Sequence, residues 1–323
     1  MRRTVFVAMA LAGLLAPVGA ALGAAAEPAK VTVDRDNAKG VLRVLADGKE
    51  AFAFHYGADL DLPYVLPRSP SGKALTVVQA DPWPHHRSVW FADTVQLAGQ
   101  RQANFYMALY SRADKKDPKS PFRDRIRVAS IEPPRAEGAQ TILDARLLWE
   151  MDGKTPVIDE ARRMRVAALG AGEFLLDLTF TVTASYGDVT FLSDAAHYAW
   201  PYVRMDPAFS VEKGGAMTNS EGGLNQKGTC NKPAKWVDYS NTVEGVAEGL
   251  AVFCHPDIGP APTWLTRDYG TFGPRREAAR NGAKFTLARG QSMVQRVALL
   301  VHGGDVKAGK VEERYQQYAR GKL

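Results

Sequence analysis

The chain has 323 residues, of which 46% are hydrophobic and 24% are charged, and its formal net charge at pH 7 is +6. This composition is ordinary for a globular protein and leaves enough residues for one large core or two smaller ones. The positive charge is modest and includes no long block of Lys or Arg. It therefore argues against a nucleic-acid-binding protein but permits contact with acidic sugars.

An export signal is predicted at the N-terminus. The basic pair Arg2-Arg3 precedes an almost entirely apolar run at 5–22, and three alanines close the segment at 24–26. This is the order of a cleavable secretory signal peptide, and the glycines and proline within the run disfavour a retained anchor. We expect residues 1–26 to be removed and residues 27–323 to form a single domain in the periplasm or outside the cell. Because no second apolar run of 18 residues occurs, the mature chain is not expected to span a membrane.

Short segments of strand character follow along the rest of the chain. We expect strands at 31–33, 41–45, 51–56, 75–79, 104–110, 125–131, 141–149, 157–169, 175–183, 189–192, 250–254, 284–287 and 293–301. Residues 175–183 alternate strictly, with Leu176, Leu178, Phe180 and Val182 on one face and polar side chains on the other. Within 157–169, we interpret Asp159, Glu160, Arg162, Arg163 and Arg165 as a solvated strand face.

The C-terminus carries the only clear helical pattern. Val311, Tyr315 and Tyr318 stand at i, i+4 and i+7 among polar residues, which predicts a short C-terminal helix. Many short strands and one helix predict an all-β protein, a β-sandwich or barrel of antiparallel strands. A glycine- and asparagine-rich stretch at 212–235 exceeds the usual loop length, which is typical of a lid or binding loop. Cys230 and the following Trp236 favour an ordered loop over a mobile insertion.

The two cysteines, Cys230 and Cys254, leave two possibilities open. Export permits a disulfide between them, whereas a buried thiol and a separate loop thiol fit the spacing equally well. Neither belongs to a Cys-x-x-Cys pair, so a redox or zinc-thiolate role is disfavoured.

The candidate functional residues gather in three loops that each carry histidine. The first, at 81–90, holds His85 and His86 between prolines and tryptophans. The second holds His197, and the third begins at His255. The phosphate-loop, Gly-x-Ser-x-Gly and His-Glu-x-x-His motifs do not occur. Because sandwich loops gather at the ends or over one face of the sheets, we expect these histidines to converge.

Converged imidazole, guanidinium and aromatic groups suit sugar chemistry. His197 and His255 are predicted as general base or acid, with Tyr269 assisting proton transfer. Arg204 and Arg267 are predicted to bind substrate, and Trp90 and Trp264, like Trp83, offer rings on which a sugar can stack. For each tryptophan the alternative is a place in the core. His85 and His86 are predicted to orient the substrate or to bind a divalent metal.

Several of these blocks together resemble the PmoA-like family of exported bacterial proteins. The matching text is PYVLP at 63–67, SPSG at 69–72, PHHRSVWF at 84–91, His197-Tyr198 with Arg204, GLAVFCHP at 249–256 and WLTRDYGTF at 264–272. The resemblance runs from about residue 62 to 302. This sequence departs from the family pattern at two places. Before Pro84-His85-His86, Pro82-Trp83 stands where family members commonly have a further histidine and an aspartate. After His255-Pro256, the usual asparagine is replaced. The resemblance implies a large β supersandwich similar to galactose-mutarotase-like folds, which often host sugar epimerases, glycoside hydrolases and polysaccharide lyases. The methane oxygenase activity in that family's name needs membrane-spanning helices, which the mature sequence lacks.

Taken together, these observations predict an exported carbohydrate-active enzyme, a glycoside hydrolase or polysaccharide lyase. Two alternatives remain open. One is a non-catalytic carbohydrate-binding protein, which needs the aromatic rings but no titrating histidine. The other is a metal-binding protein of the cell envelope.

Overall fold

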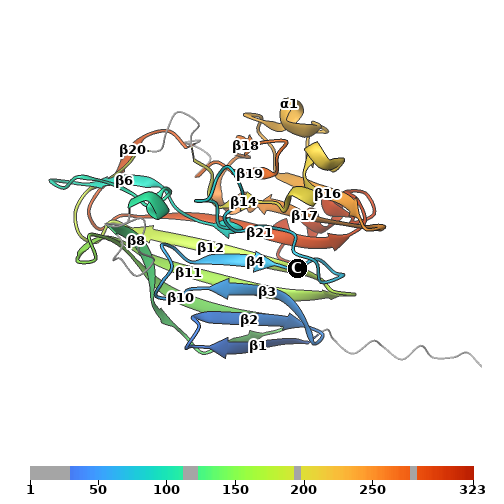
Figure 1. The fold of residues 1–323 in the computed structure, drawn as a ribbon, viewed down its shortest axis with the longest axis horizontal. Coiled ribbons are helices and arrows are strands. Elements are labelled where there is room, and N and C mark those ends of the chain that lie inside the picture. The colour runs from blue at the N-terminus through green and yellow to red at the C-terminus, as the bar shows by residue number, and fades with distance from the viewer. Residues whose placement is uncertain (1–29, 112–122, 193–197, 277–281) are drawn as a thin grey trace, which may run out of the picture.

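The structure, a computed structural model, describes residues 30–111, 123–192, 198–276 and 282–323. The predicted signal at 1–26 and His197 lie outside the described residues. In the described part, three antiparallel sheets account for most of the regular structure (Figure 1). Among the described residues, no helix combines the length and apolar character that crossing a membrane requires.

The first sheet has eight strands. Their order is β1 (Val31–Asp36), β2 (Val41–Ala46), β3 (Lys49–His55), β4 (Tyr64–Pro67), β5 (Val89–Trp90), β14 (Tyr202–Arg204), β19 (Thr271–Pro274) and β18 (Trp264–Thr266). Consecutive hairpins build one side of this sheet, from β1 to β4. The other side consists of very short strands that are far apart in the sequence, and these strands carry the candidate site residues.

The second sheet has nine strands. Eight follow in the order β15 (Ala216–Asn219), β16 (Trp236–Val243), β17 (Val246–Cys254), β21 (Ser292–Gly303), β12 (Glu173–Thr183), β11 (Thr155–Gly170), β10 (Gln140–Met151) and β8 (Asp124–Ile131). The ninth, β9 (Arg135–Glu137), pairs with β10. The long central strands of this sheet lie behind the β1–β4 hairpins in Figure 1.

Smaller elements complete the described chain. A four-stranded sheet has the order β20 (Phe285–Leu287), β13 (Val189–Phe191), β6 (Thr94–Leu97) and β7 (Gln102–Asn104). The helices are α1 (Asn225–Thr229) and α2 (Val311–Ala319), with single 3-10 turns η1 (Ala108–Ser111), η2 (Pro207–Phe209), η3 (Val211–Lys213) and η4 (Pro256–Ile258).

The main core lies between the eight-stranded and nine-stranded sheets. Strand β12 has one face in this core: Leu176, Leu178, Phe180 and Val182 are buried there, and the residues between them belong to the opposite face. Phe180 stacks on Phe91 with ring centroids 4.1 Å apart. The alternation expected from the sequence is therefore confirmed, and with it the all-β sandwich of antiparallel strands.

The outer face of the nine-stranded sheet is only partly covered. Helix α2 packs there through Val311, Tyr315 and Tyr318, which join a second hydrophobic cluster with residues of β17 and β21. The predicted C-terminal helix and its apolar stripe are thus confirmed. Beside the helix, the same face remains open over β10, β11 and β12.

The solvated face predicted for 157–169 is wrong for two of its five charged residues. Glu160 and Arg162 point into the core, where they form an ion pair of 2.7 Å. Glu160 also accepts a hydrogen bond from Trp149 Nε1, at 2.8 Å, and the Arg162 guanidinium lies 5.0 Å from the centre of the Phe180 ring. Neighbouring residues of a strand alternate between its faces, so five nearby charges cannot share one.

Two further expectations of strand are wrong. Residues 75–79 form only isolated bridges, and 104–110 contains the end of β7 followed by the turn η1. The stretch 212–235 is ordered, as expected, because η3, β15 and α1 form within it. Cys230 and Cys254 are both free, so the disulfide alternative does not hold in this structure. Burial raises the pKa of the Cys254 thiol well above its ordinary value.

Candidate functional site

A row of aromatic rings crosses the eight-stranded sheet on the face opposite to Val65 and Val89, and Tyr64, Trp90 and Tyr202 are themselves buried there. Strand pairing sets His55 opposite Tyr64, Tyr64 opposite Trp90, and Trp90 opposite Tyr202. His55 stacks on Tyr64 and Trp90 on Tyr202, with centroids 4.7 and 4.8 Å apart. Because successive side chains of a strand alternate, Val65 and Val89 face the core instead. The row forms the floor of the candidate site.

The loop between β4 and β5 is fixed over this floor by buried polar contacts. Arg87 makes a two-pronged ion pair with Asp61, at 3.2 and 3.0 Å, and also donates to Pro84 O. Ser88 lies within 2.6 Å of Thr76 Oγ1 and donates to Val65 O. These contacts lock the loop to the sheet, so the two histidines before Arg87 occupy defined positions.

His85 and His86 lie against each other among aromatic rings. Their ring centroids are 4.6 Å apart, and His86 lies 5.1 Å from Trp90. Tyr106 is 5.2 Å from His85, and its hydroxyl is 3.4 Å from His86 Nε2. We call this group the imidazole–aromatic site, defined by Trp83, His85, His86, Trp90, Tyr106, Tyr110 and Arg204.

Two rings of the imidazole–aromatic site reach solvent while the histidines beneath them are buried. Trp83 and Tyr110 are 41% and 40% exposed, whereas His85 and His86 are each 3% exposed. Trp83 lies 6.2 Å from both imidazoles, and Tyr110 lies 5.7 Å from His85. The arrangement offers flat apolar faces above polar, water-poor groups.

Four buried nitrogen atoms of this site have no hydrogen-bond partner among the described residues. They are His85 Nδ1, His86 Nδ1, Trp90 Nε1 and Arg204 Nε. A buried polar atom without a partner costs about 1–3 kcal/mol, so such atoms are rare and tend to mark functional sites. Other such atoms, for example Trp200 Nε1 and Arg314 Nη1, lie elsewhere among the described residues, so the distinctive feature of this site is that four of them occur in one cluster.

Both imidazoles are held neutral by their surroundings. Burial, with a contribution from Arg87, lowers the pKa of His85 to about 4. Burial, aided by His85, Arg204 and Arg87, lowers the pKa of His86 to about 3. At neutral pH each side chain is therefore a neutral imidazole, in which one ring nitrogen donates a hydrogen bond and the other accepts one.

These lowered pKa values predict acid sensitivity. An unfolded histidine takes up a proton near pH 6.5, whereas folded His85 and His86 resist it, so stability is full above pH 6.5 and falls as the pH drops below it. We expect the urea midpoint of the wild type to fall between pH 7 and pH 5 more than that of the double variant His85→Gln/His86→Gln. Equal falls in the two proteins would contradict the buried neutral state.

Arg204 connects the site to the third predicted loop. Its Nη1 donates to Tyr269 O at 2.5 Å, and its guanidinium lies 4.7 Å from the centre of the Tyr269 ring. Burial lowers the pKa of Arg204. Since its backbone N–H donates to Ser88 O at 2.7 Å and its guanidinium donates to Tyr269 O, Arg204 joins the first and third loops.

His255 does not join the other histidines, so the predicted convergence is wrong for this residue. It follows β17, where its ring packs 5.0 Å from Tyr318 of α2 and its Nδ1 accepts from Asp257 N. Tyr318 covers the outer face of the nine-stranded sheet. The two sheets therefore separate His255 from His85 and His86. Because β17 belongs to the second sheet, the loop that follows it opens over a different surface.

Three other predicted binding residues differ from expectation. Trp264 is fully buried and donates to Ala234 O, and Trp90 is 1% exposed, so neither ring has a free face for a sugar. Trp90 contributes instead through its unpartnered Nε1. Arg267 donates to Cys230 Sγ and to Thr266 O, contacts that lie beside α1 and β18. Trp83, at the tip of its loop, is the tryptophan with an exposed face.

The metal predicted at His85 and His86 would have two candidate ligands among the described residues. Two neutral imidazoles with unpartnered Nδ1 atoms are competent ligands. Within the described ranges, however, no group of three or more His, Cys, Asp or Glu side chains could hold a metal ion. The described residues thus supply two ligands, fewer than the three or four protein ligands of a zinc-type site.

Several site residues were missed in the sequence, although signals for them exist. Tyr202 stands two residues before Arg204, which on a strand places both on one face. Tyr106 and Tyr110 are four residues apart, the spacing of one helical turn, although the apolar residues of 104–110 also fit the strand predicted there. Tyr64 and His55 meet only through strand pairing, which the sequence does not display.

Comparisons with known proteins give a family and some distant structural likenesses. The model of a family described as "Family of unknown function (DUF6807)" matches residues 41–316. No curated protein matches the chain. The galactosidase domain of an alpha-galactosidase-sucrose kinase, AgaSK, is 8% identical over 84% of this chain and 42% of its own, with a TM-score of 0.45.

Two further structures show the same level of likeness. A galactose 1-epimerase from Lactobacillus acidophilus NCFM is 9% identical over 85% of this chain and 99% of its own, with a TM-score of 0.37. A polysaccharide lyase is 12% identical over 90% of this chain and 34% of its own, with a TM-score of 0.33. The chain thus spans about 42% of the length of the first galactosidase. At these TM-scores no conclusion about the chain's activity follows.

Proposed function

The chain belongs to the DUF6807 family of unknown function, and from this premise we propose that it is an exported carbohydrate-active enzyme that cleaves an acidic polysaccharide at the imidazole–aromatic site. One observation carries the proposal: four buried nitrogen atoms without partners belong to a cluster whose two histidines lie beside the exposed rings of Trp83 and Tyr110. Export follows from the predicted signal at 1–26. The resemblance to the PmoA-like family remains a prediction and adds no activity to the proposal.

The aromatic rings and the unpartnered nitrogens match the two kinds of surface on a sugar. The C–H face of a sugar ring packs on flat apolar rings such as Trp83 and Tyr110, while its hydroxyl and carboxylate oxygens need donors. Trp90 Nε1 and Arg204 Nε are such donors. His85 Nδ1 and His86 Nδ1 accept from hydroxyls when the proton is on the other ring nitrogen.

Electrostatics favour an acidic sugar. Arg204 carries a buried positive charge, and its pKa is lowered because burial penalises that charge. A carboxylate bound beside it compensates for the lost hydration and offers the two oxygens that a guanidinium binds best. The same carboxylate raises the pKa of the neighbouring imidazoles, because an opposite charge favours their protonated form. Substrate binding therefore turns a weak base into a stronger one.

Elimination fits these groups better than hydrolysis. Most glycoside hydrolases use a pair of carboxylates. In the described part of the chain, neither His85 nor His86 is hydrogen-bonded or ion-paired with a carboxylate, and the nearby Asp61 is held by Arg87. Neutral imidazole and phenol groups around an arginine instead suit removal of a proton next to a carboxylate.

The proposed step balances without water or a cofactor. A neutral imidazole, His86 or His85, takes the proton from C5 of a uronate, next to the carboxylate that Arg204 stabilises. The electron pair of that C–H bond forms the C4–C5 double bond while the C4–O bond breaks. The leaving oxygen takes a proton from a phenol such as Tyr106. Tyr269, predicted to assist proton transfer, serves to hold Arg204, and His197 remains a proposed acid or base.

The proposal predicts that Trp83 binds substrate. We expect Trp83→Ala to raise KM for an acidic polysaccharide about five- to tenfold, because it removes a stacking face. Tyr186→Ala is the matched control. Tyr186 is also 40% exposed, but its hydroxyl donates a hydrogen bond to Asp159 on β11 of the nine-stranded sheet. Ultraviolet absorbance of the unsaturated product measures both variants.

A screen of polyuronates and matched neutral glycans tests the activity itself. Unsaturated products from a polyuronate are the expected result. Saturated products would show that the protein cleaves the polysaccharide by hydrolysis and not by elimination. Saturable binding without any product on prolonged incubation would instead favour the non-catalytic carbohydrate-binding protein.

A further inference from the structure

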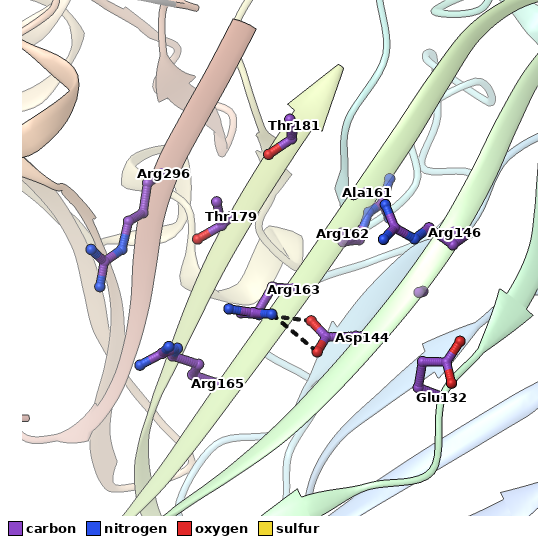
Figure 2. A pocket seen from close by; sticks show the side chains of 11 residues that line it. Glu132, Asp144, Arg146, Ala161, Arg162, Arg163, Arg165, Thr179, Thr181 and Arg296 are labelled. Atoms are coloured by element: carbon purple, nitrogen blue, oxygen red, sulfur yellow. Dashed lines mark hydrogen bonds and ion pairs between the residues drawn. The ribbon is translucent and has the colours of Figure 1, made fainter. Parts of the chain in front are cut away.

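An open groove lies on the outer face of the nine-stranded sheet, away from the imidazole–aromatic site. It has a volume of about 590 Å³, and its floor is formed by side chains of β10, β11 and β12. Figure 2 shows Arg146, Arg163 and Arg296 around this groove, with Thr179 and Thr181 between them. We call it the arginine groove.

Strand register explains the hollow. Arg146 stands opposite Ala161, and Ala161 stands opposite Thr181, so two small residues follow an arginine across three strands. In the next row Asp144 is opposite Arg163, Arg163 is opposite Thr179, and Thr179 is opposite Arg296. Long side chains therefore stand around short ones. Helix α2 closes one side, because Arg296 lies 5.7 Å from the Tyr318 ring.

Most arginines of the groove are held in place by carboxylates. Arg163 donates to Asp144 at 2.7 Å (Figure 2), and Arg296 donates to Asp177 at 2.7 Å. Arg165 is 3.5 Å from Glu137. Arg146 is exposed and makes no hydrogen bond or ion pair with the described residues. The groove thus presents oriented guanidinium groups and one arginine, Arg146, without a hydrogen-bond or ion-pair partner among the described residues, and the carboxylate of Glu132 also lines it.

The spacing of these groups suits a chain of anions better than a single one. Arg163 and Arg165 are two residues apart on one strand, about 7 Å. Arg163 and Arg296 are separated by two strand spacings, about 10 Å. One small anion reaches one or two of these guanidinium groups, whereas an oligomer with a carboxylate on each unit reaches several. Thr179 and Thr181 add hydroxyls for the units in between.

We propose that the arginine groove binds a segment of an anionic oligosaccharide, at a second site on the face of the sandwich opposite the imidazole–aromatic site. The binding needs no turnover, so it goes beyond the enzymatic activity proposed above and does not depend on it. A long acidic polysaccharide that is bound in the arginine groove stays at the protein surface, while the rest of the polysaccharide remains free.

Calorimetric titration with an oligogalacturonate tests the site. We expect Arg146→Gln to weaken binding about tenfold, the effect of one charge-assisted contact, and Arg146→Glu to weaken it further. Arg146 has no partner in the described structure, so its replacement leaves no carboxylate unpaired. Arg43→Gln, at a half-exposed arginine on β2 of the other sheet, is the matched control and should bind like the wild type. Galacturonic acid monomer and a neutral malto-oligosaccharide should each bind at least about tenfold more weakly than the oligogalacturonate.

The outcomes separate this site from the enzyme activity. Equal binding by wild type and both Arg146 variants would overturn the arginine groove, whether or not the protein cleaves the polymer. Equal affinity for the neutral oligosaccharide would overturn its anionic character. Loss of binding in the Arg146 variants supports the groove even if no product forms, in which case only the proposed activity fails.

Discussion

Replacing Arg87 by methionine is expected to destabilise the protein by about 3–5 kcal/mol, the cost of leaving a buried charge without its partner. The Arg87 and Asp61 side chains are each 4% exposed and lie 3.0 Å apart. Methionine keeps most of the side-chain volume but removes the charge, so the buried Asp61 side chain loses its ion-pair partner. The midpoint of urea unfolding at pH 7 measures the loss.

A matched substitution separates this effect from the general cost of losing an arginine. Arg43 is 37% exposed, and its ion pairs with Asp34 and Glu50 are 3.8 and 3.5 Å long. We expect Arg43→Met to cost at most about 1 kcal/mol, because exposed ion pairs contribute little. The double variant Asp61→Asn/Arg87→Met should recover part of the lost stability, since it also removes the Asp61 carboxylate that Arg87→Met leaves without a partner. Similar losses for Arg87→Met and Arg43→Met would show that the loop before β5 is held by other contacts.

Replacing His86 by glutamine is expected to lower kcat on a polyuronate by about 10²–10⁴-fold, the usual contribution of a general base. Glutamine keeps a polar side chain of similar length but cannot take a proton from carbon. The prediction rests on the place of His86, between Trp90, Tyr106 and the charge of Arg204. Initial rates of product absorbance measure it, and circular dichroism checks that the variant is folded.

His255→Gln is the decisive control, because the sequence predicted His255, and not His86, as a general base or acid. Its ring lies against Tyr318 on the far side of the nine-stranded sheet, so we expect kcat to change by less than about twofold. Should His255→Gln lose as much turnover as His86→Gln, the chemistry would belong to another face of the molecule. A fall in KM alone for His86→Gln would likewise contradict a role in proton transfer.

The sequence predicted the fold class well because alternation is a local property. In β12, four apolar residues at every second position had to share a face, and they do. The helix at the C-terminus was equally visible, since Val311, Tyr315 and Tyr318 recur at helical spacing. The short strands β5, β14, β18 and β19 were missed, because two to four residues are too few to show a period.

The candidate site was only half visible in the sequence. The rigid loop at 81–90 was recognisable from its prolines, tryptophans and paired histidines, and in the structure both histidines carry a buried, unpartnered Nδ1. The partners Tyr106, Tyr202 and Tyr269 come from other parts of the chain. Which of them meet His86 depends on pairings between distant strands, such as Trp90 with Tyr202.

What the sequence by itself determined is therefore local: an apolar leader that predicts export, the two-residue period of the strands, the helical period of α2, and the residue types available for chemistry. What only the tertiary structure decided is which loops share a face. The loop that begins at His255 resembled the loop at 81–90 in its prolines and tryptophan, but β17 belongs to the nine-stranded sheet, and two sheets with a core between them keep the histidines apart. The arginine groove was hidden for the same reason, since the cross-strand register that sets small residues among arginines is a long-range property.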